Sequence, residues 1–290
     1  MRYSLCSRFR GTLLGAAVGG MLAQTNNPAS TKDTQPNAAD FTWERLATQV
    51  AQSLIEQGKL SYPANQIRTS HSVKVIIATL PIALFYHENE ARLQAHLQQF
   101  VAWQNDPELV AGVLAVGYTI ASSLRETSIA NLIGRIIQLV AAPQLQLTQQ
   151  LIQIQSLLKQ RASLAKAISV LGQEDLSSAI ALSLFCYLST PEDFSLSVKR
   201  ATLVSQQSPF SSIVGALSGA HNGSANIPLP WRLALSRDRQ LLGTWGVQSE
   251  AELLRLCDAL VAAWSGAYNT TIDDSIQIAA IAAPRVIRPR

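Results

Sequence analysis

The chain has 290 residues, of which 48% are hydrophobic and only 14% are charged. That apolar content is enough for a large buried core and excludes a chain that is disordered throughout. The formal net charge is +4, but no run of lysine and arginine interleaved with aromatic residues accompanies it, so we expect no nucleic-acid partner.

The cysteines and the N-terminal residues indicate in which cellular compartment the protein is expected. Cys6, Cys186 and Cys257 are far apart and form no CxxC pair, which is typical of proteins in a reducing environment. Residues 1–24 resemble a secretory signal, but Arg10 lies late in that stretch, and its apolar run is shorter than the roughly 20 residues that span a bilayer. We therefore expect a cytoplasmic protein with no membrane contact.

Apolar residues recur at spacings of three and four through most of the sequence, and alternating strand patterns are lacking, which predicts an all-α fold. In chain order, the expected helices are 7–23, 41–57, 70–87, 92–104, 108–124, 128–140, 146–171, 174–189, 191–205, 211–221 and 250–264. Residues 24–40 are rich in Asn, Pro, Ser, Thr and Asp, which favours a loop. No stretch has the composition of a linker, so residues 1–290 are expected to form a single domain.

Two glycine stripes are the most informative local pattern. Gly11, Gly15 and Gly19 recur every fourth residue, and residues 215–223 repeat that spacing. On a helix, residues four apart lie on one face, so each stripe is a smooth surface that a second backbone can approach closely. The stripes predict two tightly packed helices.

The first stripe also carries a family resemblance. Residues 8–23, RFRGTLLGAAVGGMLA, resemble the opening of ADP-ribosylglycohydrolases, which reads R-x-x-G-x-L-L-G-x-A-x-G-D-A-x-G. The likeness continues in the family's order through residues 44–60, 79–87, 212–220 and 227–231. It implies a compact, single-domain fold of orthogonal helices. It also implies two magnesium or manganese ions, which orient ADP-ribose and a water for cleavage of a glycosidic bond at the ribose.

The family's metal-binding aspartates come from a T-D-D-T motif, a D-x-D-T/S motif and the G-D pair of the first stripe. The positions of this chain that match these motifs are Gly20, Thr42, Trp43, Glu44, Gln206, Gln207 and Ser208. Thr42 and Trp43 stand at the adjacent aspartates, and Gly20 replaces the aspartate of the G-D pair. Neutral side chains cannot offset the charge of two neighbouring dications. The resemblance therefore predicts a degenerate member without metal cofactors or an assigned catalytic residue.

These positions can still bind a ligand. The indole of Trp43 can fill the volume that the ions vacated or stack on a purine or nicotinamide ring. Gln206, Gln207 and Ser208 precede a helix whose start is marked by Pro209, and its exposed amide groups can bind a polar ligand or phosphate.

Other acids and histidines offer weaker candidates. Asp273 and Asp274 echo the T-D-D-T motif but are more typical of the start of a terminal segment. The pairs 174–175 and 192–193 are expected in first turns of helices, as partners of the helix dipole. His221 follows the second stripe and can either face a pocket or cap the helix end.

Three functions remain open on the sequence. The first is an ADP-ribosylglycohydrolase-like scaffold that is non-catalytic and binds an ADP-ribose-like nucleotide or a protein partner. The second is an active glycosyl hydrolase with an altered site, which removes ADP-ribose from a protein or small molecule. The third is a purely structural, crystallin-like protein, a use to which this fold is also put.

Overall fold

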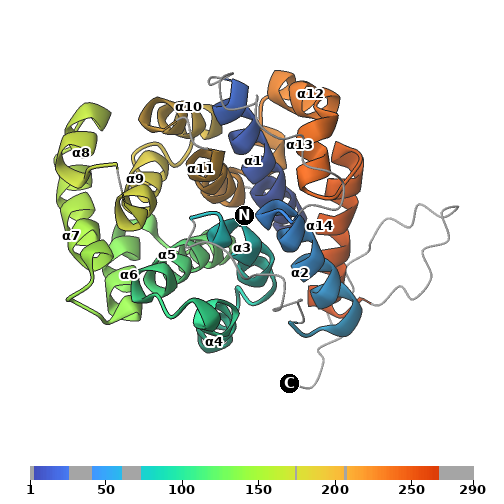
Figure 1. Cartoon of the computed structure of the whole chain (residues 1–290), viewed down its shortest axis with the longest axis horizontal. Helices are drawn as coiled ribbons and strands as arrows, with labels where there is room; N and C mark the ends of the chain where they lie inside the picture. The colour runs from blue at the N-terminus through green and yellow to red at the C-terminus, as the bar shows by residue number, and fades with distance from the viewer. Residues whose placement is uncertain (1–2, 26–40, 61–72, 174, 206–207, 268–290) are drawn as a thin grey trace, which may run out of the picture.

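A computed structural model describes residues 3–25, 41–60, 73–173, 175–205 and 208–267, and within these ranges all regular secondary structure is helical (Figure 1). The predicted all-α class is confirmed. The α-helices are α1 (Leu5–Thr25), α2 (Trp43–Gln57), α3 (Val75–Phe85), α4 (Glu90–Val101), α5 (Pro107–Leu124), α6 (Leu132–Val140), α7 (Gln146–Lys159), α8 (Leu164–Leu171), α9 (Leu176–Leu188), α10 (Phe194–Val204), α11 (Ser208–Asn222), α12 (Leu229–Arg237), α13 (Arg239–Thr244) and α14 (Glu250–Ser265). Short 3₁₀ turns occupy Ala102–Gln104, Ile129–Asn131 and Ser224–Asn226.

The observed helices differ most from the sequence prediction in two regions. The single helix expected over 146–171 is divided into α7 and α8, because Arg161 adopts a left-handed φ of 49° between them. Ser163 then begins α8 by accepting a hydrogen bond from the Lys166 amide at 3.2 Å. The short helices α12 and α13 were not expected at all. The predicted loop at 24–40 lies outside the described residues from residue 26 onward.

Helices α1 and α11 run antiparallel with their glycine stripes in contact. Gly11 lies against Gly219, and Gly15 lies against Gly215. A Cβ built on Gly219 would stand 1.9 Å from the carbonyl oxygen of Gly11, and one on Gly15 would stand 2.3 Å from the carbonyl oxygen of Gly215. Backbone therefore touches backbone along this line, as the stripes predicted.

Helices from both halves of the chain pack directly against this pair, namely α3, α5, α9, α10, α12, α13 and α14, and the other helices pack mainly on these neighbours. Figure 1 shows α1 between α10 and α11 on one side and α12 to α14 on the other. Helix α5 contacts α3, α4, α6, α9 and α11, which explains why it is apolar on every side. By length and composition α5 could cross a membrane, but 83% of it is buried inside the fold, as expected of a core helix.

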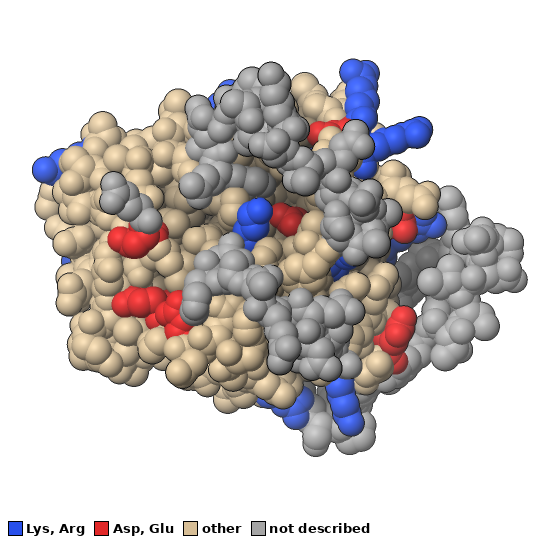
Figure 2. Space-filling model, viewed as in Figure 1, with Lys and Arg blue, Asp and Glu red and all other residues tan. Residues whose placement is uncertain are grey.

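The visible surface carries few charges. Figure 2 shows isolated acidic and basic side chains on a face that is mostly neutral. This matches a charged fraction of 14% and leaves polar and apolar groups to cover most of the molecule. On this face the described charged side chains are scattered and do not form a broad charged patch.

We expect Gly219→Ala to destabilise the protein by about 3 kcal/mol or more, because the new methyl group meets a backbone carbonyl that cannot rotate away. Gly134→Ala in α6 is the matched control, since nothing lies within 4 Å of its added Cβ. That control should stay within about 1 kcal/mol of wild type or gain stability, because alanine is the better helix former. Urea unfolding measures both, and equal effects would contradict the backbone contact.

Candidate functional site

Three of the positions that match the family motifs, Thr42, Trp43 and Glu44, lie at the start of α2. Thr42 is the N-cap residue, and its hydroxyl oxygen accepts a hydrogen bond from the Arg45 amide at 3.1 Å. The same hydroxyl donates to the carbonyl oxygen of Thr244 at the end of α13. A cap of this kind typically stabilises a helix by about 1 kcal/mol. Both hydrogen-bonding roles of Thr42 are therefore used within the fold.

Two further side chains of α2 bind the same end of α13. Arg45 donates from Nη2 to the carbonyl oxygen of Gly243 at 2.9 Å, and Thr48 donates from Oγ1 to that of Trp245 at 2.9 Å. The last carbonyl groups of a helix have no partner within the helix, and these bonds add to the capping at the end of α13, where the Gly243 carbonyl also accepts from the Gly246 amide at 3.0 Å. These hydrogen bonds thus join α2 to α13, about 200 residues further along the sequence.

Trp43 points into the core. It is 6% exposed and belongs to the main cluster of buried apolar residues. Phe41 packs against it edge to face, with 5.1 Å between the ring centroids. This arrangement is typical of an aromatic pair that fills space and excludes water.

Glu44 is the one carboxylate among these positions, and it is partly buried. Burial raises its pKa above the ordinary value for a glutamate, and a backbone hydrogen bond and the nearby charge of Lys74 only partly oppose that effect. A raised pKa means that the surroundings favour the neutral acid over the anion. Such a group is a weaker ligand for a hard cation than an exposed carboxylate.

The other matched positions lie where α1 ends and α11 begins. Gly20 is buried near the C-terminal end of α1, and Ser208 is the first residue of α11. Because Gly19 lies against Ser211, Gly20 and Ser208 are brought to the same end of the α1–α11 pair. Gln206 and Gln207, like Asp273 and Asp274, lie outside the described residues.

Within the described part of the chain, no three side chains of His, Cys, Asp or Glu come together where they could hold a metal ion. The described positions that match the family's motifs contribute one carboxylate, that of Glu44. A set of this composition does not fit a pair of divalent cations, which need several oxygen ligands and enough negative charge to offset their own.

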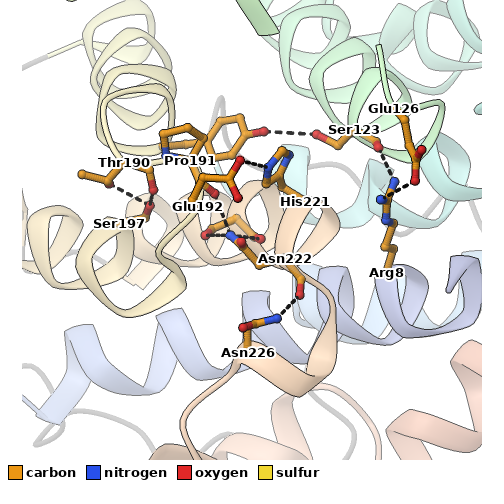
Figure 3. A network of polar contacts seen from close by, with 12 residues as sticks. Arg8, Ser123, Glu126, Thr190, Pro191, Glu192, Ser197, His221, Asn222 and Asn226 are labelled. Carbon is orange, nitrogen blue, oxygen red and sulfur yellow. Dashed lines mark hydrogen bonds and ion pairs between the residues drawn. The ribbon is translucent and has the colours of Figure 1, made fainter. Parts of the chain in front are cut away.

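The opposite end of the α1–α11 pair contains a cavity of about 460 Å³, which we call the Arg8–His221 cavity. The residues that line it are Tyr3, Arg8, Ser123, Glu126, Thr127, Ser128, Ile129, Ala130, Glu192 and His221. They come from the start of α1, the end of α5 and the segment after it, the turn between α9 and α10, and the end of α11. Figure 3 shows two polar groups of this lining, one formed by Arg8, Ser123 and Glu126 and the other by Glu192 and His221.

Arg8 anchors one wall of this cavity. It is 6% exposed, and its Nη1 donates to the carbonyl oxygen of Ser123 at 2.7 Å. Its Nη2 donates to Glu126 Oε1, also at 2.7 Å. The two bonds fix the guanidinium in the wall, because each uses a different nitrogen of its planar fork.

The other wall contains His221, whose Nε2 lies 3.6 Å from Glu192 Oε1. Tyr187 connects the two walls: its ring packs edge-on against His221 with 6.0 Å between centroids, and its hydroxyl lies 3.2 Å from Ser123 Oγ. Burial raises the pKa of Tyr187 to about 12, so the phenol stays protonated at neutral pH.

Sequence reasoning found only part of this cavity. His221 was recognised as a residue that could face a pocket, and it does line the cavity. Glu192 was expected in the first turn of a helix, but α10 begins at Phe194, and Asp193 is its N-cap, accepting from the Leu196 amide at 2.9 Å. Asp175 likewise caps α9 instead of lying in its first turn. Glu126 had no local pattern that marked it.

Comparison with known proteins places the chain in a family. A family model described as ADP-ribosylglycohydrolase matches residues 30–270. Because that match covers most of the chain, the protein belongs to the ADP-ribosylglycohydrolase family, in agreement with its all-α fold and its paired glycine helices. No curated protein is matched by this sequence.

Removing the buried indole of Trp43 should destabilise the fold. We expect Trp43→Ala to lower the free energy of unfolding by about 3–5 kcal/mol, through lost burial and the cavity left behind. Trp103→Ala is the control, since Trp103 is 40% exposed and should cost clearly less. Chemical denaturation compares them, and a Trp43→Ala loss no larger than that of the control would show that Trp43 is not a core residue.

The raised pKa of Glu44 predicts a pH effect on stability. A group whose pKa is higher in the folded protein stabilises it below the unfolded pKa of about 4.5, and that contribution is lost as pH rises through the folded pKa. Glu44→Gln should therefore raise Tm at pH 7, with a gain that shrinks towards pH 4.

Glu56→Gln, at an exposed position of the same helix, should leave Tm nearly unchanged at both pH values. The measurement is thermal unfolding followed by circular dichroism. A stabilisation by Glu44→Gln that is the same at pH 4 and pH 7 would contradict the proposed burial effect.

Proposed function

We propose that this ADP-ribosylglycohydrolase-family protein is non-catalytic, lacks the binuclear metal site, and binds an ADP-ribose-like nucleotide in the cytoplasm. The observation that carries the proposal is the burial of Trp43. This residue stands at a position where the family resemblance expects a metal-binding aspartate. Its side chain is 6% exposed and packed against Phe41. An indole in that setting offers no ligand to a cation.

The neighbours of Trp43 support the same conclusion. The Thr42 hydroxyl caps α2 and donates to Thr244, so it is committed to the fold. Glu44 is held in surroundings that favour its neutral form. One such carboxylate cannot offset two dications a few ångströms apart, and without them no metal-bound water is available to attack the glycosidic bond.

Nucleotide binding does not need the metal ions. The amide groups in the first turn of α11 face the end of the molecule that holds Gly20 and Ser208, and the helix dipole there favours a pyrophosphate. The close contact of α1 with α11 holds that helix start in place. The family relationship supports ADP-ribose as the nucleotide, since the family is named for the ADP-ribosyl group.

Two assays test the proposal. Purified protein is incubated with ADP-ribosyl-arginine in the presence of Mg²⁺ or Mn²⁺, and free ADP-ribose is measured; we expect none above the uncatalysed rate. ADP-ribose binding is then measured by calorimetry without metal, and we expect a saturable signal that Mn²⁺ does not strengthen. Metal-dependent release of ADP-ribose, or a Tm that rises with Mn²⁺, would instead support an active hydrolase with an altered site.

Ser208→Asp sharpens the binding test, because a carboxylate at the first residue of α11 repels a pyrophosphate while remaining compatible with a helix start. We expect ADP-ribose affinity to fall about tenfold or more, because the new carboxylate is placed against the negative charge of the phosphates. Ser163→Asp, at the N-cap of α8, introduces the same charge elsewhere and should leave affinity unchanged. Failure of the wild-type protein to bind ADP-ribose would reject the nucleotide-binding role and leave a protein-binding or structural one.

A further inference from the structure

We propose that the outer face of α10 and α12 binds an amphipathic helix of a protein partner, one whose apolar side is flanked by Asp and Glu. We call this surface the α10–α12 face and define it by its four exposed leucines, Leu196, Leu203, Leu229 and Leu233. The proposal rests on where these side chains lie, on their spacing and on the charges around them. Neither nucleotide binding nor a metal ion is needed for it.

Exposed apolar side chains are concentrated on these two short helices. Eight large apolar side chains of the described residues are exposed, and four of them belong to α10 and α12. Leu203 is 77% exposed and Leu229 is 63% exposed, the two highest values among the eight. Single exposed leucines are common on protein surfaces, but a cluster of them is typical of an interaction site.

The side chain of Trp231 connects α12 to α10. Its indole packs against the ring of Phe194 with 6.2 Å between the centroids, and the ammonium nitrogen of Lys199 lies 6.0 Å from the centroid of the same indole. In Figure 1 both helices stand at the upper edge of the molecule, on either side of α1. The exposed leucines of the two helices therefore belong to neighbouring elements on the same part of the surface.

The spacing of the leucines matches the repeat of a packed helix pair. Leu196 and Leu203 are seven residues apart on α10, with exposed Lys199 between them, and Leu229 and Leu233 are four residues apart on α12. Positions four and seven apart lie on one face of a helix, and amphipathic helices present their apolar anchors to a partner in this way. A helix laid along α10 would meet a leucine at every second turn.

The charges of the two helices have one sign. Every charged residue of α10 and α12 is basic, namely Lys199, Arg200, Arg232 and Arg237. Glu250 binds Arg232 through Nε and Nη2, so that charge is compensated. Lys199 and Arg237 are exposed, and neither forms an ion pair with an acid in the described part of the chain.

The acids closest to these helices are engaged by backbone amides. Asp193 caps α10 by accepting from the Leu196 amide at 2.9 Å, and Asp238 caps α13 by accepting from the Leu241 amide, also at 2.9 Å. Both therefore complement helix starts. A partner helix with Asp and Glu beside its leucines would supply the negative charge that the α10–α12 face lacks.

The same charges argue against two other occupants. A second copy of this chain would bring basic helices against basic helices, which is unfavourable. An anionic membrane typically attracts clusters of about four to eight Lys or Arg, whereas these helices offer three once the Arg232–Glu250 pair is set aside.

Fluorescence anisotropy with labelled peptides of three heptads tests the proposal. The first peptide has leucine at positions a and d and glutamate at e and g, where like charges also keep it from pairing with itself. The second has lysine at e and g, and the third has serine at a and d. We expect saturable binding of the first, weakened by added NaCl, and at least about tenfold weaker binding of the other two. Equal binding of the glutamate and lysine peptides, or no binding of any peptide, would overturn the proposal.

Three variants locate the binding surface. Leu203→Gln removes the most exposed leucine, and Lys199→Glu reverses the charge beside it; we expect each to lower the affinity for the glutamate peptide about tenfold. Ile152→Gln, at a 54% exposed position of α7, is the matched control and should bind like wild type. All three positions are exposed, so Tm should stay close to that of wild type. Equal affinities of wild type and Leu203→Gln would show that the peptide binds elsewhere and would overturn the assignment.

Two further measurements distinguish the other occupants. Analytical ultracentrifugation compares wild type with Leu203→Gln, and we expect both to be monomers; a wild-type dimer that the variant abolishes would assign the face to a second copy. Co-sedimentation uses phosphatidylcholine vesicles with about 30% phosphatidylserine, and we expect no binding. Vesicle binding that Leu203→Gln abolishes, without binding of any peptide, would assign the face to a membrane. Either of these results would overturn the proposal.

Discussion

The contact of backbone with backbone between α1 and α11 is the constraint on which the rest of the molecule depends. Gly15 and Gly215 lie so close that a single methyl group on either would meet a carbonyl oxygen of the other helix. A contact that close fixes the relative height of the two helices, because a shift along the axis would place larger side chains opposite one another. Each end of the pair is therefore a rigid place on which other elements can assemble a site.

The two ends have different chemistry. At one end, α11 begins beside the end of α1, and this is the end where the family resemblance expects metal-binding acids and where the chain has Gly20 and Ser208. At the other end, α11 stops beside the first turns of α1, and the Arg8–His221 cavity opens. Glu126 and Glu192, the carboxylates that line the Arg8–His221 cavity, therefore lie at the end that the family resemblance does not mark.

The start of α2 is stabilised by Thr42 and Trp43, at the two positions where the family resemblance expects aspartates. A threonine at the N-cap satisfies an open amide of α2 and an open carbonyl of α13 at once. The following tryptophan contributes apolar burial where a carboxylate would need ligands or water. These residues hold α2 against α13 and the core through hydrogen bonds and apolar packing.

Much of the fold could be predicted from the sequence, because its main features are local. The period of apolar residues locates most helices, and the spacing of Gly11, Gly15 and Gly19 identifies the face on which α1 is packed. The break at Arg161 was missed because the apolar stripe continues across it, and only the left-handed backbone there reveals the turn. The Arg8–His221 cavity was mostly missed for another reason: Glu126 and Glu192 come from separate segments, and no pattern within either segment tells that they share one cavity.

The central claim is that this family member keeps the helical frame and lacks the binuclear metal site. Anomalous diffraction from crystals soaked with MnCl₂ and ADP-ribose tests it most directly, because manganese is located without reference to activity. The account predicts nucleotide density at the start of α11 and no pair of manganese peaks beside the starts of α2 and α11. Two peaks about 4 Å apart, the usual separation in two-metal sites, would contradict it.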